Sequence, residues 1–443
     1  MSVAHPDRSL EKRWRLLLTA AALATLAASP GGRAETVAIT HARVLSMGPA
    51  GDIARGMVVI RDGRIASVGP DGAGPAGARI VDAQGGVVTP GLIAVGAPYG
   101  VQEVGEGVEE TDDDSTSSNR ISAAFDPSVA VNPNSVLIPI ARLGGITSAV
   151  ITPIIRGGRG GALRPEPLMF AGQAAVIQLG GGANLVQRAH VGVVLAMGEA
   201  GGGPAGGSRA AQIALLKEIL GDVRAYQRNK AGYEAGRSRA LSLGRADLEA
   251  LIPVVEGREP LIASVDRASD IRVVIALARE EKLKLILEGV AEGWRVAGEI
   301  AAAHVPVMVA GEQDLPSSFD AIGSRLDNAA LMLAAGVEVV LEDPPIYEGG
   351  RTPRISAGRA AAHGLSVGAA LAAITSVPAR VFGLEDRIGS LAPGKDADLV
   401  VWSGDPLEPL SAPTAVFIKG VQQPMRSRDL DLRDRYMPRP AGQ

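Results

Sequence analysis

The chain has 443 residues, with 44 lysines and arginines against 48 aspartates and glutamates, and a formal net charge of −4. Aromatic residues make up only 3% of it, so it lacks the basic face and the stacking side chains that nucleic-acid binding requires. The absence of cysteine excludes disulfides, thiolate metal sites and cysteine nucleophiles.

The first residues are typical of a secretory leader. Four basic residues between Arg8 and Arg15 precede an apolar run, LLLTAAALATLAA, which is too short to form a stable membrane-spanning helix. Small residues at Gly32 and Ala34 predict cleavage after Ala34. We expect residues 1–34 to be a signal peptide, and the mature protein to be periplasmic or extracellular with no membrane span. An uncleaved membrane anchor is the alternative.

Short β-type runs separated by turns follow the leader and return at the far end of the chain. The first set is TVAITHARVLSM, GMVVIRDGRIASVG and ARIVDAQGGVVTPG, in which Asp62-Gly63 is a hairpin signal. The second set is IGSLAPGKDADLVVWSGDP and PTAVFIKGVQQ. The pattern predicts that residues 35–89 and 385–425 form one composite β domain, followed by a C-terminal tail at 426–443.

Residues 90–384 show a different pattern, in which short apolar strands alternate with amphipathic helices. Helical spacing is clearest in SDIRVVIALAREEK and GWRVAGEIAAAH. This alternation predicts a parallel sheet with helices outside, and its length fits a (β/α)8 TIM-type barrel. A doubly wound open sheet is the alternative. We also expect one helix over 208–234 with a solvated basic end. The predicted strands are 146–152, 260–265, 284–289, 305–310 and 337–342.

Three segments carry a resemblance to a known family. They are ARVLSM…IVDAQGGVVTPGLI, DRASDIRVVIALAREEKLKLILEGV and AITSVPARVFGLEDRIGSLAPGKDADLVVWSGDPL. Together they resemble the imidazolonepropionase-like branch of the amidohydrolase superfamily over nearly all of residues 36–420. The resemblance implies an α/β fold, with a barrel and a small composite β-sandwich domain built from both chain ends. It also implies metal-dependent hydrolysis of non-peptide carbon–nitrogen bonds.

The residues at the family's metal-binding positions do not match that chemistry. The His-x-His pair that ends the family's first barrel strand falls on Gly96 and Pro98 in PGLIAVGAP. The metal-bridging lysine falls on Gln178 in GQAAVIQL, and one of the later histidines falls on Gly289 in LILEGV. We therefore expect these to be pocket positions, and we expect no metal or other cofactor.

Carboxylates and a serine stand at the remaining positions that the resemblance marks. The other late histidine falls on Ser264 or Asp266, and the aspartate that ends the last strand falls on Glu342 or Asp343. Strand ends in such a barrel face the pocket, which makes Asp266, Glu288 and Asp343 the candidate catalytic residues.

Without a metal these carboxylates would repel one another. We therefore expect at least one of them to be protonated or paired with an arginine such as Arg267. A structural ion pair is an equally simple explanation. The acidic segment from Glu103 to Asp114 consists of residue types that bind hard cations, but a solvated loop explains it more simply.

Two functional hypotheses follow. The first is a non-catalytic binding or partner subunit in the cell envelope. It would bind a small molecule, or act beside a metal-bearing amidohydrolase relative or as a homo-oligomer, with segment 101–118 at the contact. The alternative is a hydrolase of cyclic amides or acylated amino acids, working with an altered or metal-free site.

Overall fold

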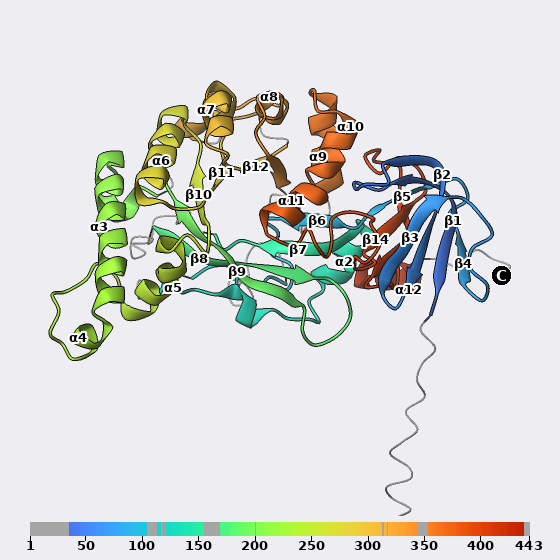
Figure 1. Cartoon of the computed structure of the whole chain (residues 1–443), viewed down its shortest axis with the longest axis horizontal. Helices are drawn as coiled ribbons and strands as arrows, with labels where there is room; N and C mark the ends of the chain where they lie inside the picture. The colour runs from blue at the N-terminus through green and yellow to red at the C-terminus, as the bar shows by residue number, and fades with distance from the viewer. Residues whose placement is uncertain are drawn as a thin grey trace, which may run out of the picture.

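The computed structural model describes residues 35–103, 113–116, 118, 120–154, 169–199, 201–311, 314–316, 318–342 and 353–437. A barrel surrounded by helices lies beside a smaller sheet domain (Figure 1). Within these residues, no helix is long and apolar enough to cross a membrane. The predicted signal peptide, 1–34, lies outside the described residues.

The smaller domain is one sheet built from both ends of the chain. Its order is β16-β15-β14-β5-β1-β2-β3, with β4 also paired to β1, and β5 joins the two halves by pairing antiparallel with β14. This confirms the expected composite domain. The strands are β1 (Val37–Leu45), β2 (Asp52–Arg61), β3 (Arg64–Pro70), β4 (Arg79–Asp82), β5 (Val87–Pro90), β14 (Leu399–Trp402), β15 (Pro413–Ile418) and β16 (Val421–Gln422).

Local sequence explains the tightest turn of this sheet, and one tryptophan explains how the sheet meets the barrel. Asp62 and Gly63, with φ of 55° and 74°, form the predicted hairpin turn between β2 and β3. The indole of Trp402 is fully buried and donates from Nε1 to Thr89 Oγ1 at 2.9 Å. A Cβ on Gly145, just before β7, would lie 2.6 Å from Trp402 Cη2. Only glycine at this position therefore allows the backbone to lie so close to the indole.

The larger sheet runs β6-β7-β8-β9-β10-β11-β12-β13. Residues 373–374 close it, because Ile93 N donates to Ile374 O at 2.9 Å and Leu341 N donates to Ala373 O at 3.0 Å. The predicted barrel is therefore confirmed. Its strands are β6 (Leu92–Val95), β7 (Ile146–Ile151), β8 (Phe170–Gln178), β9 (Val186–Ala196), β10 (Leu261–Val265), β11 (Leu285–Gly289), β12 (Val307–Ala310) and β13 (Val339–Glu342).

One strand departs from the expected all-parallel arrangement. β8 pairs antiparallel with both β7 and β9, whereas the other neighbouring pairs are parallel. The reason lies in the connection between β8 and β9, residues 179–185, which reads LGGGANL. A link this short joins antiparallel strands, since a parallel crossover needs a dozen or more residues.

Helices cover the outside of the barrel. The predicted helix over 208–234 is present in two pieces, α3 and α4, divided at Asn229, whose side chain caps α4. The helices are α2 (Leu137–Leu143), α3 (Arg209–Arg228), α4 (Lys230–Glu234), α5 (Arg245–Val255), α6 (Ala268–Glu281), α7 (Ala297–Ala302), α8 (Asn328–Ala334), α9 (Pro353–Ala362), α10 (Val367–Ala372), α11 (Ser376–Val381) and α12 (Arg428–Tyr436).

Side chains from every strand fill the barrel interior. They form one buried cluster with Phe382, Leu384 and Ile388, which follow α11 and plug the end where the parallel strands begin. We call this end the barrel base, and the end where β6, β7 and β9–β13 finish the barrel mouth. The strand residues of the cluster are Ile93, Val95, Val150, Ala171, Ala174, Val176, Val191, Val194, Ile262, Ile286, Met308 and Val340.

Candidate functional site

Strand alternation brings polar residues together just inside the barrel mouth. Ile262, Ile286 and Val340 belong to the interior cluster. Side chains two residues apart in a strand share a face, so Ser264, Glu288 and Glu342 also point inward, one layer nearer the mouth. Ser264 and Glu288 are direct neighbours in the register of β10 and β11.

Two of these residues, Glu288 and Glu342, form a carboxyl pair. Burial raises the pKa of Glu288 to about 7, and burial with the nearby Glu288 raises the pKa of Glu342 well above its usual value. The contact between them lowers the pKa of Glu288 and raises that of Glu342, so the proton of the pair resides mainly on Glu342, and Ser264 lies close enough to lower the pKa of Glu288 as well. The second carboxyl oxygen of Glu342, Oε1, is buried and has no hydrogen-bond partner among the described residues. The site therefore holds at least one neutral carboxyl group at neutral pH.

Asp266 stands beside this pair at the end of β10. Its Oδ1 accepts a hydrogen bond from Ala291 N at 3.1 Å, and burial raises its pKa. A Cβ on Gly289, which has a φ of 81°, would lie 2.8 Å from Asp266 Oδ1. Glycine at 289 thus leaves room for this carboxyl group. The predicted pairing of Asp266 with Arg267 is not present among the described ion pairs, and burial instead shifts the pKa of Asp266 upward.

A small cavity of about 250 Å³ opens at this point of the mouth. Asp320 and Glu199 shape its rim: Asp320 Oδ2 accepts from Glu199 N at 2.7 Å, and Glu199 Oε2 accepts from Phe319 N at 3.1 Å. Arg209 pairs with Asp320, and its Nε also donates to Asp270 Oδ2 at 2.8 Å. The cavity is lined by Met197, Glu199, Ser264, Val265, Asp266, Ser318 and Asp320.

Sequence reasoning missed the rim residues. Glu199 comes shortly after the end of β9. Because residues that follow a barrel strand lie at the mouth, Glu199 would have been a candidate if that strand had been predicted from the sequence. Asp320 lies in a short 3-10 turn (Phe319–Ala321) with no pattern that marks it, and it reaches the site only through the fold.

The other predicted pocket residues do not all lie at the mouth. Gly96, with a φ of 80°, and the buried Pro98 follow the mouth end of β6, as expected. Asp343 lies outside the described residues. The prediction for Gln178 is wrong. Because β8 runs in reverse, Gln178 lies at the base, where its Nε2 donates to Asp398 Oδ2 at 2.8 Å. Burial raises the pKa of that aspartate to about 6.

The described residues do not supply the donor set of a catalytic metal centre. Among them there is no group of three or more His, Asp or Glu residues able to hold a metal ion. His41 and His190 each contact an aspartate at 3.0 Å, Asp82 and Asp126 respectively. His304 lines a cavity where β12 begins, and His363 follows α9. Burial raises the pKa of the mouth carboxyls Asp266, Glu288 and Glu342, and protonated oxygens are poor metal ligands.

Comparison with known proteins matches this fold. The model of the Amidohydrolase family matches residues 277–426. "Amidohydrolase tasK" of Hapsidospora irregularis is 46% identical over 61 residues, which is 14% of this chain and only 6% of that protein. An amidohydrolase from Thermotoga maritima MSB8 superposes with a TM-score of 0.76 at 26% identity, over 88% of this chain and 100% of that one.

A second solved structure, molinate hydrolase, has a TM-score of 0.54 at 17% identity, over 93% of this chain and 99% of that one, and shares the fold. The family match covers the last barrel strands and the return into the composite sheet, while the Thermotoga structure covers nearly the whole chain. On these grounds residues 277–426 belong to the Amidohydrolase family, and the chain as a whole has the fold of an amidohydrolase-superfamily protein.

Proposed function

We propose that this protein is a non-catalytic binding barrel of the amidohydrolase superfamily, in which a carboxyl cluster replaces the metal centre. The observation that carries the proposal is the buried pair of Glu288 and Glu342 beside Asp266, all three with raised pKa values. Raised pKa values favour the neutral forms of these groups while the site is empty. A cation that enters the site favours their ionised forms instead. The ligand we propose is therefore a small amine or guanidinium compound.

The cavity supports this ligand class. Its lining holds the carboxyl groups of Glu199, Asp266 and Asp320, of which only Asp266 belongs to the cluster, together with two serine hydroxyls and no Lys or Arg among the described residues. A volume of about 250 Å³ accommodates a small ligand head group rather than a drug-sized molecule. The carboxyl groups would accept N–H bonds from a cation, which are stronger than bonds between neutral groups.

Calorimetry on the leader-free protein tests the proposal, with methylguanidinium and n-butylammonium as probes. We expect saturable binding that tightens as the pH rises from 6 to 8 and releases protons, because a cation in the mouth favours the ionised forms of Asp266 and of the neighbouring Glu288 and Glu342. Asp266→Asn and Glu288→Gln should weaken it by roughly tenfold or more. Glu280→Gln, an exposed carboxylate on α6 paired with Lys217, is the matched control. Binding that ignores both pH and the site variants would contradict the proposal.

Metal content gives a second expected result. After exposure to Zn²⁺, Mn²⁺ or Co²⁺ and dialysis, the leader-free protein should hold well under one equivalent, because the mouth offers protonated carboxyls and no histidine among the described residues. Mass spectrometry of the metal content is the measurement. One tightly bound equivalent per chain that is lost in Asp266→Asn would overturn the absence of a metal centre.

We further propose that the protein acts in the cell envelope beside a partner that is a metal-bearing relative. Three apolar side chains near the mouth support a protein contact, since Leu315, Phe319 and Ile322 are 76%, 83% and 63% exposed. A pull-down from the native envelope fraction, with Phe319→Ser as the variant, should recover a partner that the variant loses. Recovery of the protein alone, or only as copies of itself, would reject the heteromeric partner.

A metal-free hydrolase is the second candidate, and one observation favours it. A pKa of about 7 for Glu288 suits a general base at neutral pH, and the protonated Glu342 beside it suits an acid. Turnover of an acylated amino acid or a cyclic amide by the isolated chain, abolished in Glu288→Gln, would establish this function and exclude the non-catalytic one.

A further inference from the structure

A second and larger cavity, of about 640 Å³, lies at the barrel base, on the side of the molecule away from the carboxyl cluster. It opens where β10, β11 and β12 begin, at Pro260, Leu285 and Pro306, next to the plug that follows α11. We call it the base cavity. Nothing in the proposed function of the mouth uses it.

The floor of the base cavity is apolar. Val191, Ile286 and Phe382 belong to the buried cluster that fills the barrel, and they form the innermost part of the lining. Ile275 and Leu285 add apolar surface from α6 and from the start of β11. The floor therefore offers a ligand an apolar surface comparable to that of ordinary small-molecule sites.

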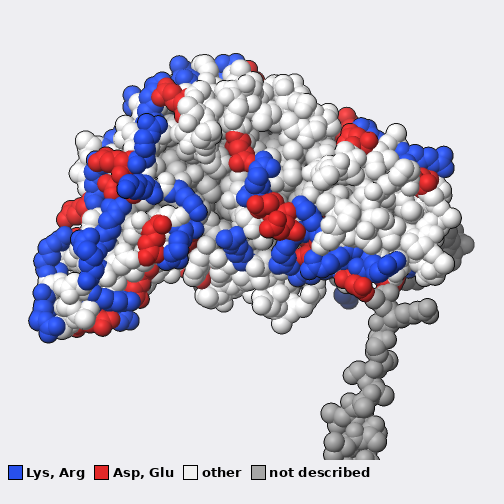
Figure 2. Space-filling view, viewed as in Figure 1, with Lys and Arg blue, Asp and Glu red and all other residues white. Residues whose placement is uncertain are grey.

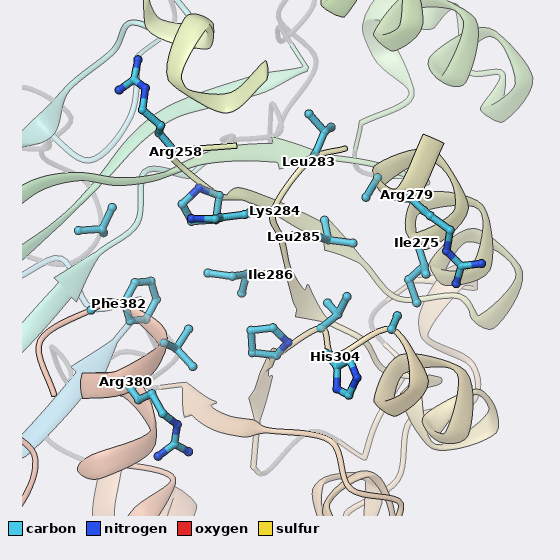
Figure 3. A pocket seen from close by; sticks show the side chains of 18 of the residues that line it. Arg258, Ile275, Arg279, Leu283, Lys284, Leu285, Ile286, His304, Arg380 and Phe382 are labelled. Carbon is cyan, nitrogen blue, oxygen red and sulfur yellow. The ribbon is translucent and has the colours of Figure 1, made fainter. Parts of the chain in front are cut away.

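The rim, by contrast, is basic. Five Lys and Arg side chains and two histidines line the cavity, and no Asp or Glu among the described residues does. Figure 3 shows Arg258, Arg279 and Arg380 on three different sides, with the apolar side chains between them. The basic lining consists of Arg188, His190, Arg258, Arg279, Lys284, His304 and Arg380.

Part of this charge is not neutralised. Arg258 and Arg380 pair with Glu256 and Glu338. Arg279 and Lys284 have no carboxylate partner among the described residues. Arg279 stands in the last turn of α6, where a cation favours the helix dipole, but Lys284 lies beyond that helix.

Arg188 is the third cation without a carboxylate partner in the described part of the chain. Its Nη1 donates to the backbone oxygens of Phe382 and Gly383, at 3.3 and 2.9 Å. A Cβ on Gly383, which has a φ of 68°, would lie 2.3 Å from that Nη1. The guanidinium lies across the plug only because residue 383 has no side chain, and it keeps other N–H donors for a ligand.

Most basic residues of the neighbouring helices, by contrast, are paired with carboxylates. Lys and Arg also gather along α3 and α4 (Figure 2), but there Lys217, Arg224 and Lys230 pair with carboxylates. Glu259, which lies in the chain between the lining residues Arg258 and Pro260, is only partly ionised at neutral pH, because burial raises its pKa to about 7. The rim thus keeps a positive field over an apolar floor.

We propose that the base cavity binds a small organic dianion, in which an apolar ring carries a phosphate or a pair of carboxylates. The ring would pack on Ile286 and Phe382, and the oxyanion would accept N–H bonds from Arg188, Arg279 and Lys284. Guanidinium groups match the geometry of phosphate and carboxylate oxygens. The cavity volume is within the range of ordinary small-molecule sites.

Calorimetric titration of the leader-free protein at low ionic strength tests this site. The probes are phenyl phosphate, phthalate, inorganic phosphate and benzyl alcohol. We expect phenyl phosphate or phthalate to bind roughly tenfold or more tightly than inorganic phosphate, because the ring buries apolar surface. Benzyl alcohol, which lacks the charge, should not saturate the site. The tighter of the two dianions identifies the ligand as a phosphate ester or a dicarboxylate.

Charge-matched variants separate a built site from general attraction. The double variant Arg279→Gln/Lys284→Gln should lose roughly tenfold or more in affinity for the better dianion. The control Lys217→Gln/Arg272→Gln removes the same charge from exposed ion pairs on α3 and α6, and should bind like the parent. Equal loss in both double variants, equal binding of benzyl alcohol, or no saturation by either dianion would overturn the proposal. Equal thermal transitions check that both variants fold.

Discussion

Truncation of the chain after Gly389 is expected to leave a protein that aggregates instead of folding. The truncation removes β14, β15 and β16, and with them the antiparallel partner of β5, whose register runs from Leu399 opposite Pro90 to Trp402 opposite Val87. An apolar strand left unpaired at the edge of a sheet is a template for association with other chains. The loss of Trp402 also opens the interface with the barrel, and the loss of Phe417 removes a fully buried side chain from the core of the sheet domain.

Solubility, size-exclusion chromatography and thermal unfolding measure this effect. A chain truncated after Ser427 is the control, because it loses only α12, which has no buried residues, and the residues that follow it. We expect this control to remain soluble with one cooperative transition. A soluble and cooperatively folding product of the Gly389 truncation would contradict the dependence of the fold on its C-terminal strands.

Stability is expected to fall as the pH rises from 5 to 8. Burial raises the pKa of Glu288 to about 7 and that of Glu342 well above its usual value, so the folded state holds protons that the unfolded state has already lost. A group of this kind contributes stability that is fully present below its unfolded pKa, near 4.5, and is lost as the pH rises through its folded pKa. The expected decrease in the free energy of unfolding is on the order of a few kcal/mol.

Urea denaturation between pH 5 and pH 8.5 measures the slope of the free energy of unfolding against pH. The double variant Glu288→Gln/Glu342→Gln should make this slope shallower. The variant will not remove it entirely, because burial also raises the pKa of Glu259 to about 7 and that of Asp398 to about 6. Glu280→Gln, an exposed carboxylate, should leave the slope unchanged. A slope of opposite sign in the parent protein, or an identical slope in the double variant, would disprove the role of the carboxyl pair.

Local signals in the sequence were sufficient for much of the fold. The helix predicted over 269–282 is α6, Ala268–Glu281, and the strand predicted over 260–265 is β10, Leu261–Val265. The Asp62-Gly63 turn follows from the backbone preferences of those two residues. These elements depend on periodicity and turn chemistry within a few neighbouring residues, which is the information that a single sequence carries.

The candidate site could be predicted only in part. Asp266 and Glu288 were recognised because strand ends in a barrel converge at its mouth. Gln178 was misplaced because the direction of β8 depends on the short LGGGANL connection and on its two neighbours, not on the strand's own composition. Reversal of one strand moves its last residue from the mouth to the base.

The sequence by itself therefore determined the barrel, the composite sheet and the absence of histidine from the quoted ligand positions. Only the tertiary structure decided that Glu342 lies beside Glu288 in a buried pair, that Asp320 forms the rim of the mouth cavity, and that Arg188 lies across the plug. Each of these contacts joins residues more than 50 positions apart in the chain. Their proximity depends on strand order and loop direction, and their charge states depend on burial, neither of which has a local signature.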